Sequence, residues 1–152
     1  MHKLKIYVAH PINGLSYNEV VSYYKDIGKK LRQMGYEVYH PMVGKSFLRT
    51  EKKFRSDYSH PIATNHAVKE RDKWMVKHVD VLLVDFTNAR GVSIGCVSEL
   101  AWADDTPTIH TVVVLPKGNI HDHAFVKEMA DVLFESREEA LDYLRKLIEM
   151  EV

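Results

Sequence analysis

Residues 79–86 read Val-Asp-Val-Leu-Leu-Val-Asp-Phe and form the clearest strand pattern in the chain. Only the two aspartates interrupt the run of apolar side chains. A strand that is apolar on both of its alternating sides is typical of the middle of a parallel sheet, because helices cover both faces there. The stretch therefore predicts a buried parallel strand and an α/β protein.

Strand and helix patterns alternate on both sides of this stretch. Further strands are predicted at residues 4–9, 36–40, 108–115 and 132–134, the last at an edge of the sheet. Helices are predicted between Ser16 and Gly35, at residues 63–78, 95–104 and 124–129, and from Ser136 to about residue 150. Ser16 and Ser136 are each followed three residues later by a glutamate, which is the pattern of a capping box.

The alternation predicts a single domain over residues 1–152 with a flavodoxin-like fold. We expect a three-layer α/β sandwich whose five-stranded parallel sheet has the order 2-1-3-4-5. Ligands of such sheets bind at the carboxyl ends of the strands. Those ends carry residues 10–14, 86–99 and 116–123, so a functional site is expected where these segments meet.

Composition excludes several classes of function. Lys plus Arg and Asp plus Glu both number 21, so bulk charge does not favour nucleic acid or an anionic membrane as a partner. The single cysteine, Cys96, precludes a disulfide within the chain and fits a reducing, cytoplasmic setting. Neither a signal peptide nor an apolar run long enough to span a bilayer is apparent.

Residues 42–61 are polar, basic and without periodicity, and they predict a long mobile loop with a short helical turn. Loops of this length in a small domain are often functional lids. We expect the contacts that set ligand preference to lie there.

The segment 85–103 contains the residues best suited to chemistry. Gly91 and Gly95 permit close approach of a ligand to the backbone, and Gly95 is expected to open a helix whose free N–H groups favour anions. Glu99 is then expected in the first turn, pointing into the crevice. The alternative is a surface glutamate that is stabilised by the helix dipole.

Four pieces of the sequence resemble the nucleoside 2-deoxyribosyltransferase family. They are I-Y-V-A-H-P-I at 6–12, R-D at 71–72, V-D-V-L-L-V at 79–84 and G-C-V-S-E-L-A-W-A at 95–103. The resemblance implies that Glu99 attacks C1′ of the sugar, that Tyr7 orients its carboxylate, and that Asp72 touches the sugar or the base. From the residues alone, without the resemblance, Tyr7 could equally be a buried aromatic of the strand, and Asp72 could equally be a charge on the helix surface.

The resemblance also implies shared sites in a homodimer or larger homo-oligomer. Asn119 resembles an asparagine that a neighbouring subunit lends to the 5′ end of the site. Pro11 and Asn13, in the loop after the first strand, are further candidates for substrate contact.

Ser93 departs from the pattern of transferases that act on free nucleosides. Those enzymes carry an aspartate six residues before the nucleophile. A related branch, the deoxynucleoside 5′-monophosphate N-glycosidases, has a serine there to receive a phosphate, which an aspartate would repel. His123 stands where that branch has a second phosphate-contacting serine, but Asn13 stands where it has an arginine. The sequence therefore supports only in part the hypothesis that Ser93 binds a 5′-phosphate. The alternative is that Ser93 is an ordinary turn residue without a role in binding.

The leading hypothesis is a transferase that moves 2-deoxyribose between nucleobases through a covalent glycosyl-Glu99 intermediate. The alternatives are a nucleoside 5′-monophosphate hydrolase with the same nucleophile and a non-catalytic nucleotide-binding module. The expected partners are a nucleoside or nucleotide and a nucleobase, without a cofactor.

His121 and His123 suggest a metal site, but no second cluster with ligand spacing completes it, so none is expected. Cys96 lacks a nearby base and is not expected to be the nucleophile.

Overall fold

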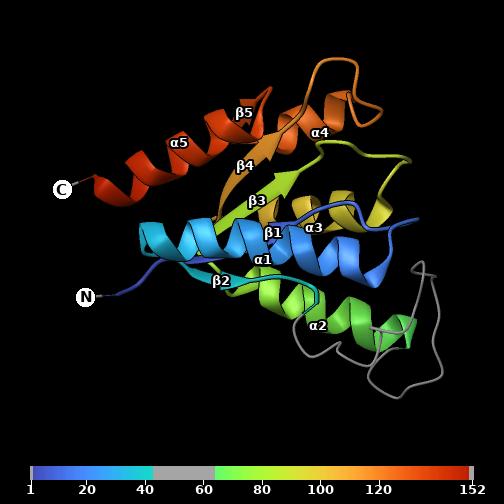
Figure 1. Ribbon diagram of the computed structural model, residues 1–152, viewed down its shortest axis with the longest axis horizontal. Coiled ribbons are helices and arrows are strands. Elements are labelled where there is room, and N and C mark those ends of the chain that lie inside the picture. Colours follow the sequence, from blue (N-terminus) through green and yellow to red (C-terminus); the bar gives the residue numbers. More distant parts are fainter. Residues whose placement is uncertain (1, 43–63, 151–152) are drawn as a thin grey trace.

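A five-stranded sheet forms the centre of the molecule (Figure 1). The computed structural model describes residues 2–42 and 64–150. All strand pairs are parallel, and the order β2-β1-β3-β4-β5 confirms the predicted topology. The strands are β1 (Lys5–Ala9), β2 (Glu37–Tyr39), β3 (Val81–Asp85), β4 (His110–Val114) and β5 (Val132–Phe134).

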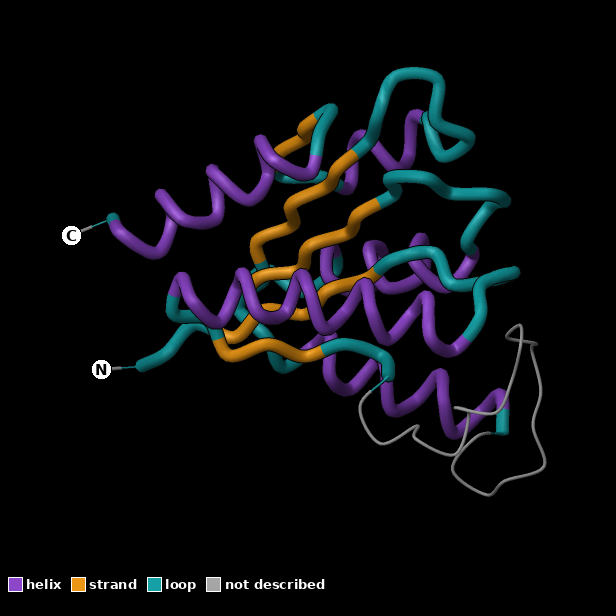
Figure 2. The backbone as a smooth tube through the Cα atoms, in the orientation of Figure 1, coloured by secondary structure: helices purple, strands orange, loops and turns teal. Residues whose placement is uncertain are grey.

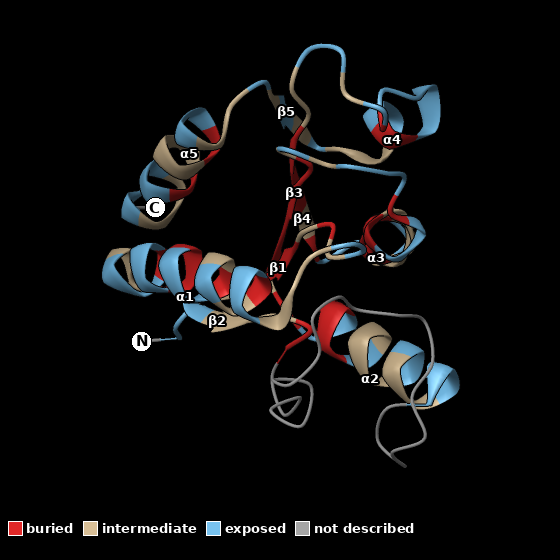
Figure 3. Cartoon of the chain, turned by 45° about the vertical axis from the view of Figure 1, so that its right-hand side comes forward, coloured by how far each residue is buried: buried red, intermediate tan, exposed pale blue. Residues whose placement is uncertain are grey.

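Helices cover both faces of the sheet and complete the predicted three layers. They are α1 (Tyr17–Met34), α2 (Asn65–Lys77), α3 (Ile94–Asp104), α4 (Ala124–Met129) and α5 (Arg137–Glu149). Helices α1 and α5 pack on one face, and α2, α3 and α4 pack on the other (Figure 3). The fold is therefore the flavodoxin-like α/β sandwich that the apolar pattern predicts.

Strand β3 is buried at all five positions, as its composition predicts. Its side chains alternate between the two faces. Leu83 joins the core under α1 and α5, whereas Leu82 and Val84 join the core under α2 and α3. Leu82 is paired with Tyr7 of β1, so the Tyr7 ring lies on the α2/α3 face of the sheet.

The predicted caps of α1 are present. The Ser16 hydroxyl accepts from Glu19 N–H, the Glu19 carboxylate accepts from Ser16 N–H, and Gly35 ends the helix in the left-handed conformation with φ 112°. At α5 the capping box is only half formed, because Glu139 accepts from the Ser136 hydroxyl instead of the Ser136 N–H.

Helix α3 differs from the prediction at its start. It begins at Ile94, with Ser93 as its N-cap, rather than at Gly95. Glu99 is therefore the sixth helical residue and lies in the second turn, not the first. The macrodipole acts mainly within the first turn, so it contributes little to the environment of Glu99.

The loops after β1, β3 and β4 all leave the sheet on the side where the parallel strands have their carboxyl ends (Figure 2). The predicted lid at residues 42–61 lies, apart from Met42, outside the described residues. None of the described helices combines the length and the apolar character that crossing a bilayer requires.

Candidate active site

Glu99 is nearly buried, although it carries an ionisable side chain. It is 7% exposed and lies on the side of α3 that also buries Cys96, Leu100 and Ala103. Glutamate is rarely buried to this extent unless it has a structural or chemical partner. The alternative of a dipole-stabilised surface glutamate is therefore wrong.

Tyr7 presents a fully buried phenol to the same region. Burial raises the pKa of Tyr7 well above its ordinary value, and the negative charges of Glu99 and then Asp72 raise it further. The phenol therefore keeps its proton at neutral and moderately alkaline pH. A neutral phenol beside a carboxylate can donate a hydrogen bond to it without adding charge.

Asp72 reaches the cluster from α2. Its side chain is only 13% exposed, so the helix-surface alternative does not describe it. Arg71 Nη2 lies 3.7 Å from Asp72 Oδ1 and also donates to the carbonyl oxygen of Pro41 at 2.7 Å. Arg71 thus links the chain after β2 to the helix that carries Asp72. The fold brings together Tyr7, Asp72 and Glu99, which are far apart in sequence.

Tyr24 is a fourth member of this cluster that sequence reasoning did not identify. Burial raises its pKa, as do the nearby Cys96 and Glu99. The position belongs to the apolar stripe of α1, so the pattern indicated only a core residue.

Cys96 is also buried, and burial followed by the charge of Glu99 raises the pKa of its thiol far above the ordinary value. A thiol in this state is a poor nucleophile.

Ser93 is the N-cap of α3 and is bound by a buried histidine. Its hydroxyl accepts from Cys96 N–H at 3.2 Å, and its own N–H donates to His121 Nε2 at 2.7 Å. Burial lowers the pKa of His121, which favours the neutral ring. Because Nε2 accepts, the proton belongs on Nδ1, which lies 3.0 Å from Asn119 Oδ1 and donates to it. The loop after β4 is thereby fastened to the start of α3.

Asn119 and His123 both make contacts within their own chain. Asn119 Nδ2 donates to the carbonyl oxygen of Phe86 at 2.8 Å, and Asn119 Oδ1 also accepts from His121 N–H at 2.9 Å. His123 caps α4 by accepting from Phe125 N–H at 3.0 Å. Their roles toward a substrate or a second subunit stay predictions.

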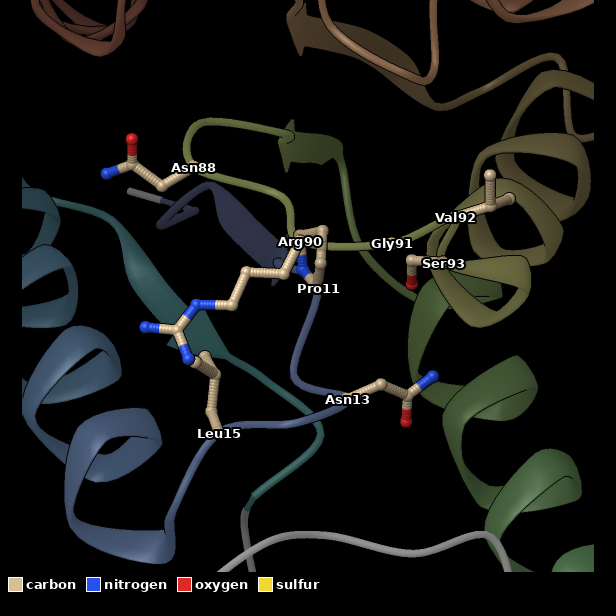
Figure 4. A pocket seen from close by; sticks show the side chains of 8 residues that line it. All are labelled: Pro11, Asn13, Leu15, Asn88, Arg90, Gly91, Val92 and Ser93. Atoms are coloured by element: carbon tan, nitrogen blue, oxygen red, sulfur yellow. The ribbon is translucent and has the colours of Figure 1, made fainter.

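A pocket opens between the loops that follow β1 and β3 (Figure 4). Eight residues from the segments 11–15 and 88–93 line this shallow opening. Pro11, Asn13 and Ser93, which were predicted as substrate contacts, all line it. So does Arg90, which sequence reasoning missed because a lone loop arginine follows no pattern. The three predicted residues are therefore brought together, with an unforeseen cation beside them.

The glycines near the pocket face open space. A Cβ atom added at Gly91 or Gly95 would meet no heavy atom within 4 Å. Neither position has a positive φ, so no part of the described chain demands glycine there. Close approach of a ligand remains the prediction for Gly95.

On the α1/α5 face of the sheet, Asp85 forms a buried network at the end of β3. Its carboxylate accepts from Arg137 Nε at 2.6 Å, from the Tyr23 hydroxyl at 2.8 Å and from Thr87 N–H at 3.0 Å. Burial alone would raise the pKa of Asp85, but the Thr87 hydrogen bond, the Arg137 charge and the Tyr23 hydrogen bond outweigh it and lower that pKa. The network joins β3, α1 and α5.

His10 ties the loop after β1 to this network. Its Nδ1 lies 2.7 Å from the carbonyl oxygen of Asp85 and donates to it, and its ring stacks on Tyr23 at 3.9 Å. Because His10 directly precedes Pro11, the network holds both loops that line the pocket. As for metals, the described ranges 2–42 and 64–150 contain no group of three His, Cys, Asp or Glu side chains placed to bind one.

Three solved structures share this architecture. A 2-deoxyribosyltransferase from Bacillus psychrosaccharolyticus has a TM-score of 0.65 at 18% identity, over 91% of this chain and 91% of that one. A CMP N-glycosidase from Clostridium botulinum has a TM-score of 0.55 at 14% identity, over 94% and 96%. A conserved protein from Enterococcus faecalis has a TM-score of 0.65 at 16% identity, over 96% and 99%.

At such low sequence identities, structural similarity shows a shared fold but does not establish the activity, which has to be argued from the site. By sequence, no protein-family model and no curated protein matches the chain.

Proposed function

We propose that this protein breaks the N-glycosidic bond of a 2′-deoxynucleoside or its nucleotide and transfers the sugar to another nucleobase. The observation that carries the proposal is the buried carboxylate of Glu99, which lies near Tyr7 and Asp72 on the α2/α3 side of the sheet. Helix α3, which carries Glu99, begins at the carboxyl ends of the strands, where ligands of this fold bind. Two proteins with the same fold are a 2-deoxyribosyltransferase and a CMP N-glycosidase, which supports a reaction at a sugar–base bond.

In the first step a carboxylate oxygen of Glu99 attacks C1′. The C1′–N bond breaks, its electron pair leaves with the base, and the base takes up a proton. The transition state resembles an oxocarbenium ion, which an adjacent carboxylate stabilises. In the second step a nitrogen of another base attacks C1′ and gives up its proton, while the C1′–O bond breaks and its electron pair returns to the carboxylate of Glu99.

Tyr7 and Asp72 would support this chemistry in different ways. Tyr7 keeps its proton and can donate to one oxygen of Glu99, which leaves the other oxygen to attack. Asp72 would accept hydrogen bonds from the sugar or the base. Pro11, Asn13, Ser93 and Gly95 would surround the 5′ end of the sugar.

Water in place of the second base would make the protein a hydrolase with the same nucleophile. The likeness to a CMP N-glycosidase supports this second candidate. A binding module without catalysis is a weaker alternative, because it gives no reason to bury a carboxylate beside a protonated phenol.

A substrate panel read by chromatography tests the proposal. Deoxynucleosides and their 5′-monophosphates are incubated with the wild type, each with and without adenine as acceptor. We expect base release, and a new nucleoside or nucleotide only when adenine is present. Release that does not depend on adenine, with no transfer product, would reject the transferase and favour the hydrolase.

Matched variants test the assignment of Glu99. Glu99→Gln is expected to lower turnover on the order of 10³-fold or more, because the amide cannot attack C1′. Glu149→Gln, at an exposed position at the end of α5, is expected to leave turnover unchanged. Full activity of a folded Glu99→Gln protein would refute both the transferase and the hydrolase.

We also propose that the sites are shared in a homo-oligomer, with a second chain contributing residues near Asn119 and His123. Ile94 and Phe125 are 75% and 73% exposed, and apolar side chains of this size are often covered at subunit contacts. Gel filtration tests this proposal, and an active monomer would contradict it.

A further inference from the structure

We infer that His121 is a positioning residue for Glu99: its neutral ring holds the start of α3 by accepting a hydrogen bond from Ser93 N–H, and protonation of the ring displaces that helix. The inference rests on the proposed function only for the role of Glu99 in turnover. It gives a task to a residue outside the reacting groups, and it predicts that a histidine sets the lower pH limit of the activity.

A continuous series of hydrogen bonds fixes the proton on the His121 ring. The carbonyl oxygen of Phe86 can only accept, so the Asn119 amide turns its nitrogen toward that oxygen, at 2.8 Å. The Asn119 oxygen then faces His121 Nδ1 at 3.0 Å and accepts from it. The proton therefore lies on Nδ1, and Nε2 keeps the lone pair that accepts from Ser93 N–H at 2.7 Å.

Both ends of this series lie on the connection between β3 and α3. It begins at Phe86, directly after β3, and ends at Ser93, the N-cap of α3. The Phe86 ring also stacks on the His121 ring, with 4.1 Å between their centroids. Because His121 is only 3% exposed, water cannot readily replace it as the acceptor for Ser93 N–H. Residues 119–121 thus join the two ends of this connection.

Ser93 is attached to α3 through its other two polar groups. Its hydroxyl accepts from Cys96 N–H at 3.2 Å, and its carbonyl oxygen accepts from Val97 N–H at 3.2 Å. Displacement of Ser93 would therefore move the first turn of α3 with it. Glu99 lies in the next turn, so its carboxylate would move as well. A misplacement of about 1 Å can cost a reaction roughly 100-fold in rate.

Protonation turns the contact between His121 and Ser93 from attractive to repulsive. An imidazolium carries a proton on both ring nitrogens, so Nε2 and Ser93 N–H would then be two donors at 2.7 Å. Burial lowers the pKa of His121 from its ordinary value, which keeps the ring neutral at physiological pH. The hydrogen bond therefore persists at neutral pH and is lost as the pH falls through the pKa of His121.

Burial alone shifts the pKa of His121. Among the described residues, no titratable or charged group of the contacting segments contributes to the shift. On the loop after β3, on α3 and in the loop of His121 itself, these groups are Asp85, Arg90, Cys96, Glu99, Lys117, Asp122 and His123.

NMR spectroscopy of the ¹⁵N-labelled protein tests the hydrogen bond without turnover. The wild type is titrated from about pH 8 to about pH 4, with His2→Gln as a control at an exposed histidine. At the upper pH we expect a ¹⁵N–¹⁵N coupling between Ser93 and His121 Nε2, which disappears at the pKa measured for the His121 ring. The amide signals of residues 93–99 should shift with the same midpoint in both proteins. A missing coupling at the upper pH, or amide signals that do not respond at this midpoint, would overturn the inference.

Kinetics tests the consequence for the reaction. His121→Gln keeps an acceptor, since a glutamine amide oxygen can take the place of Nε2, but it does not titrate. His121→Ala leaves Ser93 N–H without that acceptor. At about pH 8, where the ring is neutral, we expect His121→Ala to lower kcat by about 10- to 100-fold and His121→Gln to restore most of it, with smaller changes in KM.

The pH profile distinguishes positioning from a purely structural role. Below the pKa of His121 the kcat of the wild type should fall by about tenfold per pH unit, whereas kcat of His121→Gln should stay level until the carboxylates of the site take up protons. Equal kcat values for the wild type and a folded His121→Ala, or the same fall at low pH in the wild type and His121→Gln, would overturn the inference. If the NMR midpoints agree but no sugar–base bond is broken in any substrate, the proposed function fails and the positioning of α3 by His121 stands.

Discussion

Replacing Arg137 by glutamine is expected to destabilise the protein by about 2–3 kcal/mol. Arg137 Nε lies 2.6 Å from Asp85 Oδ2, and the Asp85 side chain is fully buried. Removing one partner of a buried ion pair costs about 3–5 kcal/mol because the other charge stays behind in a poorly solvated place. Two features reduce this cost: the Arg137 side chain is 26% exposed, and Asp85 keeps its hydrogen bonds from Tyr23 and Thr87.

The loss has a characteristic pH dependence. In the wild type the pKa of Asp85 is lowered, although burial alone would raise it, since Thr87, Arg137 and Tyr23 stabilise the ionised form. A carboxylate with a lowered folded pKa contributes stability above its unfolded pKa of about 4, and that contribution is lost as the pH falls through the folded value. Without Arg137 the folded pKa rises. The difference between the two proteins should therefore be largest at neutral pH and shrink on acidification.

Urea unfolding monitored by circular dichroism at pH 7 and at pH 4 measures both effects. For a chain of this size, the expected change corresponds to a fall in Tm of roughly 4–12 °C. Arg145→Gln is the matched control, because Arg145 pairs with Asp142 on the surface of the same helix and both side chains are about half exposed. It should change stability by less than about 1 kcal/mol. An Arg137→Gln protein as stable as the control, or a difference that does not vary with pH, would refute the role given to this network.

Three other outcomes follow from the site. Tyr7→Phe should keep the fold, since the ring stays buried. It should lower kcat by about 10- to 100-fold, because one hydrogen bond to a charged group is lost. Steady-state kinetics measures this effect, and an unchanged kcat would remove Tyr7 from the mechanism. Gly95→Ala should raise the free energy of unfolding by about 0.5–1 kcal/mol, because the added Cβ meets no heavy atom within 4 Å and alanine favours the helix. The same change should raise KM, because the added methyl group would obstruct a ligand that approaches the backbone there. A gain in stability with an unchanged KM would show that no ligand comes close to Gly95. Stability should also fall above about pH 10, because tyrosines ionise in the unfolded chain while the folded protein resists it. Burial and then the charge of Tyr143 raise the pKa of Tyr36 to about 12, and burial with nearby charges raises the pKa values of Tyr7 and Tyr24 well above the ordinary value. Tyrosinate absorbance followed beside circular dichroism should show the last tyrosines ionising only as the protein unfolds, and complete ionisation of a protein that is still folded would contradict the raised values.

The sheet could be predicted because its evidence is local. Strands β1, β3, β4 and β5 contain short apolar runs, and β3 carries apolar side chains toward both faces. The helix between Ser16 and Gly35 is marked at each end by residues whose capping chemistry depends on neighbours a few positions away. Parallel pairing then follows from the alternation of strands and helices.

The site could be predicted only where a motif marked it. Tyr24 was missed because its place in the apolar stripe of α1 says nothing about what its hydroxyl meets. Arg137 and Asp85 are 52 residues apart, and no local pattern pairs an aspartate at the end of a strand with an arginine at the start of a later helix. Arg90 becomes notable only when the loops after β1 and β3 are seen to enclose one pocket.

The start of α3 was misplaced for a related reason. Gly95 drew attention as the helix opener, but a serine side chain that accepts from the N–H three residues on is the stronger cap. Ser93 fulfils that role through Cys96 N–H, so the helix begins one residue earlier and Glu99 moves into the second turn.

The central claim is that Glu99 becomes covalently attached to the sugar. The most direct measurement is acid quenching of the wild type during turnover of a deoxynucleoside and of its 5′-monophosphate, followed by mass spectrometry of the intact protein and of its peptides. We expect a fraction of the protein to carry one deoxyribosyl group, or its phosphate, on the peptide that contains Glu99, and none in Glu99→Gln. Turnover without any adduct, or an adduct on another residue, would contradict the account.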